Sequence, residues 1–159
     1  MAFCVGDRIA HPMHGAGVID SIETRKMNGT ERDYYVIKLP VGGMNVMIPM
    51  ESSAEIGVRP IVRPEEAESI LNSIPDIEIN MTQNWNKRYR ENMLRIKSGD
   101  LMEVAAVVKG LMTREHDRGL STGERKMLSS AKQILISEIV LSQSSSYEEI
   151  EERLNTALT

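Results

Sequence analysis

The chain has 159 residues, which is enough to bury one core or two small cores joined by a linker. Hydrophobic residues make up 41% and aromatic residues only 4%, so we expect aliphatic residues and the eleven methionines to fill the cores, while Cys4, the only cysteine, excludes an intramolecular disulfide. The net charge of −4 argues against a general nucleic-acid binder, and the lack of a secretory start or an apolar run of about 18 residues predicts a cytoplasmic protein without membrane contact.

The first part of the chain, up to about residue 60, predicts short antiparallel strands. Asn28-Gly29 separates two β-rich runs, 17–26 and 32–39, and this pair favours the positive backbone angles of a tight hairpin turn. A second turn at Gly42-Gly43 leads into a strand that Pro49 closes or marks as an edge. Together with a short strand at 7–10, these runs predict a small, strongly bent antiparallel sheet or barrel.

After Pro60 the spacing of apolar residues becomes helical. Pro64 and the glutamates after it suit the first turn of a helix, and residues 72–82 are typical of a linker. The rest of the chain predicts helices, two of which begin with the spacing of a capping box. These helices are expected at 84–97, at 100–117, from Ser121 through about Ile139, and from Ser146 to the end.

No group of residues predicts an enzyme. His11 and His14 are three residues apart, but they lack a nearby third ligand, so no metal site is expected. Gly15-Ala-Gly17 precedes a strand rather than a helix, which makes it a bend and not a phosphate-binding loop. We therefore expect no catalytic residues, no cofactor and no small-molecule substrate.

One segment is basic within the acidic chain. Residues 84–132 hold 11 Lys and Arg against 6 Asp and Glu, a net charge of +5, so the rest carries −9. This segment contains Trp85, the only tryptophan, at the expected start of a helix. Trp85 could pack in the core, or it could wedge against bases in a minor groove.

Cations accompany both of the expected helix starts in this segment. Lys87, Arg88 and Arg90 follow Trp85 within about one turn, and Arg125 and Lys126 lie just inside the next capping-box helix. Side-chain cations and helix N-terminal amides both bind phosphate, so two basic helix starts could form a phosphate clamp. A solvated charged face is the equally weighted alternative.

The order of several blocks resembles the CarD/CdnL family of bacterial transcription regulators, and the resemblance covers nearly the whole chain. The N-terminal glycine pattern also resembles the polymerase-binding module of transcription-repair coupling factors, but the tryptophan block and the last block favour the stand-alone regulator. The blocks are Phe3-Cys-Val-Gly-Asp7, His11-Pro-Met-His-Gly-Ala-Gly17, Ile22-Glu-Thr-Arg25, Asn84-Trp-Asn-Lys-Arg-Tyr89, Ser98-Gly-Asp100 and Arg118-Gly-Leu-Ser-Thr-Gly-Glu-Arg-Lys-Met127.

The resemblance implies an α+β fold, in which a Tudor-like or SH3-like antiparallel β module (1–62) is followed by a short helix and linker (63–83) and an all-α bundle (84–159). The β module would dock on the protrusion or lobe of the RNA polymerase β subunit, partly by strand pairing at a sheet edge. Arg25 stands where the family uses a basic contact, Val46 and Ile48 would present the edge strand, and Met47 stands where some relatives have a second basic residue.

The resemblance also implies that the helical domain contacts promoter DNA at the upstream edge of the transcription bubble, with Trp85 in the minor groove. Such a protein would stabilise the open complex by binding it better than the closed one. An adaptor that joins polymerase to another protein, with Trp85 in the core, is the alternative. The sequence leaves the responding promoters and the oligomeric state open.

Overall fold

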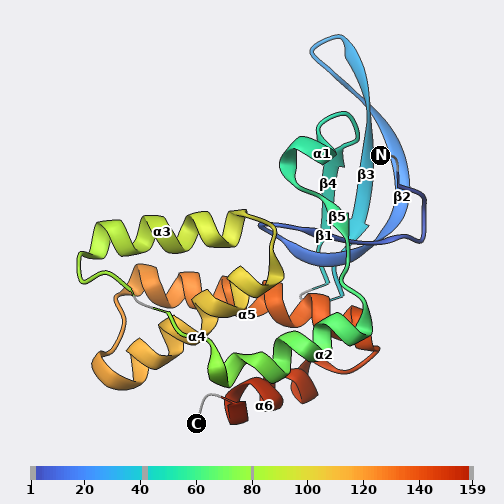
Figure 1. The fold of residues 1–159 in the computed structure, drawn as a ribbon. Coiled ribbons are helices and arrows are strands. Elements are labelled where there is room, and N and C mark those ends of the chain that lie inside the picture. Colours follow the sequence, from blue (N-terminus) through green and yellow to red (C-terminus); the bar gives the residue numbers. More distant parts are fainter. Residues whose placement is uncertain (1–2, 41–42, 80, 158–159) are drawn as a thin grey trace.

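The computed structural model describes residues 3–40, 43–79 and 81–157. A β module stands at one end of an elongated helical domain, and its long hairpin projects away from the helices (Figure 1). No helix within these three ranges is long and apolar enough to cross a membrane. The elements are β1 (Arg8–His11), β2 (Gly15–Met27), β3 (Thr30–Lys38), β4 (Asn45–Pro49), α1 (Ser53–Ile56), β5 (Arg59–Pro60), α2 (Pro64–Ser73), the 3-10 turn η1 (Ile74–Asp76), α3 (Trp85–Lys97), α4 (Leu101–Arg118), α5 (Thr122–Gln143) and α6 (Tyr147–Ala157).

The β module is one antiparallel sheet in the order β4-β3-β2-β1-β5. The predicted hairpin turn is confirmed, since Asn28 and Gly29 both have positive φ, 52° and 79°. A register shift between Ile19 and Ser21 interrupts the pairing of β2 with β3. Of the predicted Gly42-Gly43 turn, Gly42 lies outside the described residues. Side chains on one face form a small core, made of Ile9, Ile19, Tyr35, Ile37, Leu39, Ile48 and Val58.

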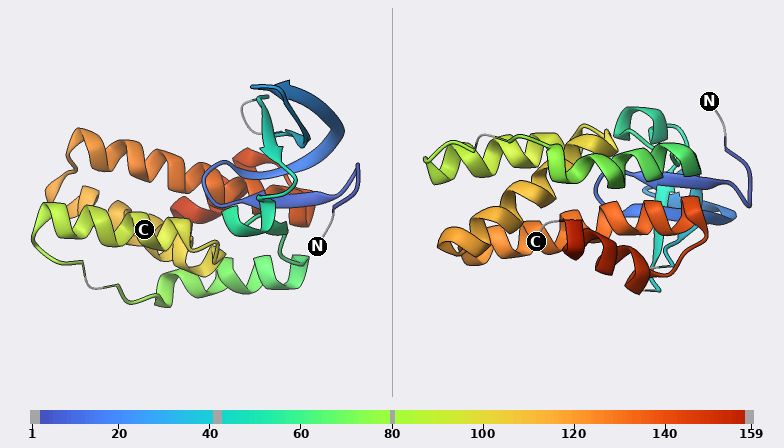
Figure 2. Two further views of the ribbon diagram at one scale, coloured as in Figure 1. Left: turned by 90° about the horizontal axis from the view of Figure 1, so that it is seen from above. Right: turned by 60° about the horizontal axis from the view of Figure 1, so that its bottom comes forward.

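The helical domain has its own core, and α5 lies at its centre among α2, α4 and α6 (Figures 1 and 2). Residues in the middle of α5 are buried on every side of the helix, which is typical of a helix covered all round. The predicted helix starts agree with the structure: Asn84, Asp100 and Ser121 are N-caps whose side chains accept backbone N–H groups. Ser146 likewise accepts a hydrogen bond from the Glu149 N–H.

The segment expected to be a short helix and linker is more ordered than its composition indicates. Helix α2 continues into η1, and Ile70, Leu71 and Ile74 are buried in the same core as α4 and α5. Pro75 is the second residue of η1, in its first turn, where proline is tolerated. The extended connection to α3 is therefore shorter than the expected 72–82. The α+β fold class is confirmed, since an antiparallel β module precedes a helical bundle.

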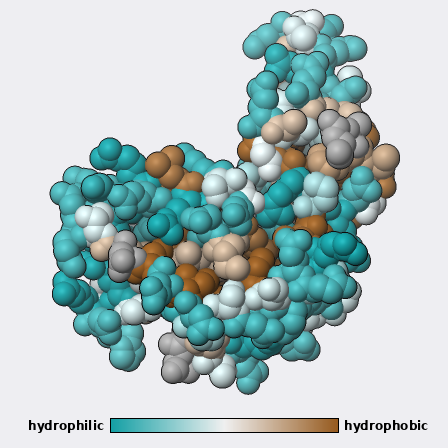
Figure 3. Space-filling model, viewed as in Figure 1, coloured by the Kyte–Doolittle hydropathy of each residue, from teal (hydrophilic) through white to brown (hydrophobic). Residues whose placement is uncertain are grey.

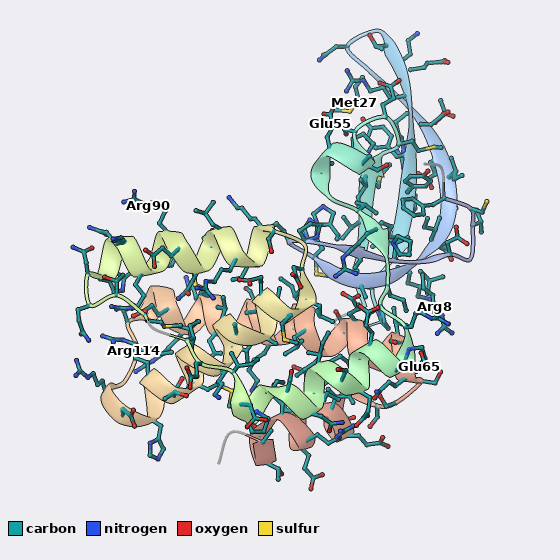
Figure 4. All side chains as sticks on the ribbon, viewed as in Figure 1. Arg8, Met27, Glu55, Glu65, Arg90 and Arg114 are labelled. Atoms are coloured by element: carbon teal, nitrogen blue, oxygen red, sulfur yellow. The ribbon has the colours of Figure 1, made fainter. Side chains whose placement is uncertain are left out.

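The β module packs directly on the C-terminal half of α5. The N–H of Ala16 in β2 donates to Ser137 Oγ at 3.0 Å, and Arg8 Nη1 donates to the carbonyl oxygen of Leu141 at 2.7 Å. Arg8 lies at this junction in Figure 4. Arg59 in β5 also donates to the carboxylate of Glu138 in α5. These contacts hold the β module beside the C-terminal half of α5, away from the N-terminus of that helix (Figure 1).

Candidate nucleic-acid interface

Trp85 is a surface residue at the first position of α3. Its side chain is 42% exposed, which rules out the core-packing interpretation. One face of the indole stacks on Tyr89, one turn later in the helix, with ring centroids 5.1 Å apart and planes inclined by 18°. A large, partly solvated aromatic ring thus stands at a helix N-terminus.

The structure brings the two predicted basic helix starts together. Trp85 Nε1 donates a hydrogen bond to Oγ of Ser121, the N-cap of α5, at 2.9 Å. Gly123 lies under the indole, since a Cβ atom at this position would be 3.5 Å from Cζ2 of Trp85. The N-termini of α3 and α5 therefore meet at the end of the helical domain that is farthest from the β module (Figure 1).

Arg88 corrects one prediction. It was expected to contact phosphate, but its side chain is only 2% exposed and forms an ion pair with equally buried Glu124. Arg88 Nε and Nη2 donate to the two carboxylate oxygens at 2.8 and 3.2 Å, and Nη1 donates to the carbonyl oxygens of Thr82 and Gln83. The hydrogen bond from Arg88 lowers the pKa of the Glu124 carboxyl despite its burial. The phosphate-contact prediction is wrong for Arg88, which stabilises the interior.

The other four predicted cations are exposed on the two helices whose N-termini meet at Trp85. Lys87 and Arg90 lie on α3, and Arg125 and Lys126 lie in the first turns of α5. In the part of the chain that the structure describes, none of them forms an ion pair. Arg90 points away from the domain (Figure 4), and hydrophilic residues dominate the face seen in Figure 3. These cations are free to contact an anionic partner.

Three further residues belong to this surface. Tyr89 supports the indole by stacking on it. Arg118 Nη1 donates a hydrogen bond to the side-chain oxygen of Gln83 at 3.2 Å. The buried Nε of Arg114 has no hydrogen-bond partner within the described residues. Arg114 and Arg118 line a hollow of about 350 Å³ beside Gln83. The four-residue spacing of Trp85 and Tyr89 could have predicted their stacking, but the approach of the two arginines depends on how α4 packs.

Three of the four residues expected to bind polymerase lie on β4, at the edge of the sheet, and the fourth, Arg25, lies on β2. Side chains alternate along this strand, so Ile48 is buried in the core, Val46 is partly buried against it, and Met47 is 40% exposed on the opposite face. Met47 shares a shallow groove of about 450 Å³ with Arg25, Lys26, Met27 and Tyr34. Arg25 and Met47 therefore belong to one surface, whereas the side chain of Ile48 does not reach it.

Backbone hydrogen bonding determines which groups of β4 face the open edge. Two bonds bracket the strand, from Leu39 N–H to the Met44 carbonyl at 2.9 Å and from Met50 N–H to the Asp33 carbonyl at 3.0 Å. Because bonded pairs alternate in an antiparallel ladder, Val46 and Ile48 turn their backbone groups towards β3. Asn45 and Met47 turn theirs outwards. Val46 and Ile48 therefore belong to the edge strand, while its outward backbone groups are those of Asn45 and Met47.

The two histidines expected to form at best a poor metal site are close neighbours. The ring centroids of His11 and His14 are 4.4 Å apart. His11 Nδ1 accepts a hydrogen bond from the Met13 N–H at 3.0 Å, so one of its two ring nitrogens is occupied. Within the described ranges, no three His, Cys, Asp or Glu side chains gather in a way that could hold a metal ion.

Comparisons with known proteins cover both domains. Residues 3–62 match the family model described as "CarD-like/TRCF RID domain", and residues 69–155 match "CarD, C-terminal domain". The Bacillus subtilis (strain 168) protein named "Putative transcription factor YdeB" is 36% identical over 137 residues, which cover 86% of this chain and 90% of that protein. The solution NMR structure of the 72-residue N-terminal domain of Myxococcus xanthus CarD is 27% identical and covers 37% of this chain and 79% of that chain, with a TM-score of 0.33. The chain belongs to the CarD family.

Proposed function

We propose that this protein is a transcription regulator that binds the β subunit of bacterial RNA polymerase and stabilises the promoter open complex by contacting DNA at the upstream edge of the bubble. Its CarD-like/TRCF RID domain implies an interaction with RNA polymerase. The observation that carries the DNA contact is the exposed indole of Trp85, which lies where two basic helix N-termini meet. An apolar ring flanked by phosphate-binding groups suits a minor groove at a distorted junction.

The arrangement of the two surfaces supports a tethered mode of action. The β4 edge and the Trp85 surface lie at different ends of the molecule, so polymerase and DNA could be held at the same time (Figures 1 and 2). Attachment to polymerase raises the local concentration of promoter DNA. A basic surface on a chain of net charge −4 then need not bind DNA tightly by itself.

The proposed mechanism needs no covalent chemistry. A protein that binds the open complex more tightly than the closed complex shifts the equilibrium between them by the difference in binding free energy. A preference of about 1.4 kcal/mol corresponds to a tenfold shift. Wedge and phosphate contacts respond to the deformability of DNA more than to base identity, so we expect weak sequence preference.

On the polymerase side, we propose pairing of a partner strand with β4. The outward N–H and carbonyl groups of Asn45 and Met47 offer main-chain hydrogen bonds, and the groove that contains Arg25 and Met47 offers side-chain contacts. Arg25 also pairs with Glu23 at 2.8 Å, and both side chains are exposed. This exposed pair contributes little to stability, so Arg25 is free to exchange Glu23 for an acidic group of the partner.

The lifetime of the open complex on a ribosomal RNA promoter tests the proposal. We expect wild-type protein to lengthen this lifetime and Trp85→Ala to lose most of the gain, with an unchanged circular dichroism spectrum. Leu94→Ala is the matched control, because Leu94 is a 64% exposed apolar residue on the same helix. If polymerase binds wild-type protein but the lifetime does not change, the protein is an adaptor without a DNA contact.

A further inference from the structure

Three polar atoms lie within hydrogen-bond distance of the Ser121 hydroxyl oxygen. Its Oγ lies 2.9 Å from Trp85 Nε1, 3.2 Å from the backbone N of Glu124 and 3.3 Å from Glu124 Oε1. The indole N–H and the backbone N–H are donors only, and an ionised carboxylate is an acceptor only. The single hydroxyl hydrogen must therefore go to Glu124, which leaves both lone pairs of Ser121 for the two N–H groups.

The buried ion pair holds this arrangement in place. Arg88 donates to both oxygens of Glu124 and is itself tied to the carbonyl oxygens of Thr82 and Gln83, just before Trp85. The pair joins the start of α3 to the start of α5. Since the Arg88 contact lowers the pKa of Glu124, the carboxylate stays ionised near neutral pH and keeps accepting the Ser121 hydrogen.

We propose that Ser121, oriented by the buried Arg88–Glu124 pair, is a positioning residue that fixes the indole of Trp85 in the orientation in which it enters DNA. This inference rests on the proposed function. Tyr89 supports one face of the ring and Ser121 holds its N–H edge, so the rest of the indole projects in one defined direction. A side chain that is ordered before binding loses less entropy when it binds.

The free protein provides the first test, because Trp85 is the only tryptophan and reports its own environment. Ser121→Gly removes the hydroxyl but keeps a residue that caps helices nearly as well, whereas Ser121→Thr keeps the hydroxyl. We expect Ser121→Gly to lower the fluorescence anisotropy of Trp85 and increase its quenching by acrylamide, and Ser121→Thr to restore both. Ser146→Gly is the matched control, since Ser146 caps α6 without touching the indole.

The second test measures open-complex lifetime with the same variants and polymerase. We expect Ser121→Gly to retain polymerase binding but lose about three- to tenfold in stabilisation, the range expected for one side chain that must be ordered on binding. Ser121→Thr should be close to wild type. If the anisotropy and quenching of Trp85 fluorescence are unchanged in Ser121→Gly, the proposal is overturned. It is also overturned if the indole of this variant is mobile but the open-complex lifetime is equal to or longer than that with wild type.

The two proposals fail in different ways. If Trp85→Ala has no effect on lifetime, the proposed DNA contact is wrong, and a positioning role in DNA binding is wrong with it. If Trp85→Ala abolishes the gain but Ser121→Gly equals wild type in lifetime, only the positioning role is wrong. A lifetime longer than wild type with Ser121→Gly would show that the indole must leave Ser121 before it binds.

Discussion

Arg59 of β5 and Glu138 of α5 form a two-pronged ion pair, with N···O distances of 2.6 and 2.9 Å. Arg59 Nε also donates to the carbonyl oxygen of Gly99, just before α4, and Glu138 accepts the N–H of Val62 at 2.8 Å. The ion pair thus joins the β module to α5 and, through Arg59, to the segment just before α4. Together with the contacts of Arg8 and Ala16, this pair holds the β module, with its β4 edge, on the helical domain that carries Trp85.

Glu138→Gln should destabilise the protein by about 3 kcal/mol, because it removes the charge that Arg59 faces in a buried site. Urea unfolding followed by circular dichroism measures the loss. Glu68→Gln is the control, since its partner Arg153 and Glu68 are both more than 40% exposed. We expect that control to lose less than about 1 kcal/mol. Similar losses in the two variants would contradict the structural role given to Glu138.

Arg88→Met should destabilise the protein by about 3–5 kcal/mol at pH 7, because it leaves the Glu124 carboxylate buried without a cation. In the wild type the folded-state pKa of Glu124 is lowered. Between the folded-state pKa of Glu124 and its unfolded-state pKa of about 4.3, the unfolded chain binds more protons than the folded chain. The stabilisation that the ion pair gives is therefore complete above about pH 4.3 and is lost as the pH falls through the folded-state pKa.

Arg88→Met reverses this pH dependence, since an unpaired buried carboxyl has a raised pKa. The loss in free energy of unfolding of Arg88→Met relative to wild type should therefore be smaller at pH 4 than at pH 7. Urea unfolding at both pH values measures this loss. Adding Glu124→Leu should remove the part of this difference that comes from the unpaired carboxyl. A deficit that is equal at pH 4 and pH 7 would show that Arg88 stabilises the fold by packing alone.

His11 should be neutral throughout the physiological pH range. Burial, and to a lesser extent the neighbouring His14, lower its pKa from 6.5 to about 4. Between these two values the unfolded chain binds more protons, so the contribution of His11 to stability rises with pH and is complete above about 6.5. An NMR titration of the ring protons checks the value. In His14→Ala the pKa should stay below 6.5, since burial is the larger cause, and titration near 6.5 in the wild type would contradict the lowered pKa of this half-buried ring.

The salt dependence of DNA binding distinguishes the cations that contact DNA phosphates from those that do not. Lys126→Ala should reduce the slope of log K against log salt by about 1, as expected for one lost phosphate contact. Lys87→Ala, Arg90→Ala and Arg125→Ala should behave in the same way. Lys97→Ala is the control, because Lys97 is exposed at the opposite end of α3. A slope that changes as much in Lys97→Ala would mean that the basic surface is not centred on Trp85.

Gly15→Ala should destabilise the contact between the β module and α5. Gly15 has a φ of +88°, and a Cβ atom there would lie 2.6 Å from Ser137 Oγ, which bonds the next N–H. Gly29→Ala is the control, with a φ of +79° and no atom within 4 Å of the added Cβ. Thermal unfolding should show a loss of about 1 kcal/mol for Gly29→Ala from the backbone angle alone, and a clearly larger loss for Gly15→Ala.

Local signals explain why most elements could be predicted from the sequence. Asn28-Gly29 adopts the turn that its backbone preferences favour, and Ser121 and Ser146 cap helices where the capping-box spacing predicted. Asn84 caps α3 at the position where this helix was expected to begin. These features depend on residues within a few positions of one another. The four-residue helix α1 and the two-residue strand β5 carry no such signal and were not predicted.

By itself, then, the sequence determined the order of the longer strands and helices, the position of Trp85 at a helix start and the basic segment around it. Only the tertiary structure decided that Arg88 faces inwards, because its partner Glu124 lies 36 positions away and is brought to it by the packing of both α3 and α5 on α4. It also decided that Met47, rather than Ile48, turns to the open edge, because the phase of the β3–β4 ladder sets the direction of every backbone group. Long-range packing, and not residue type, selects which of several similar side chains reaches a partner.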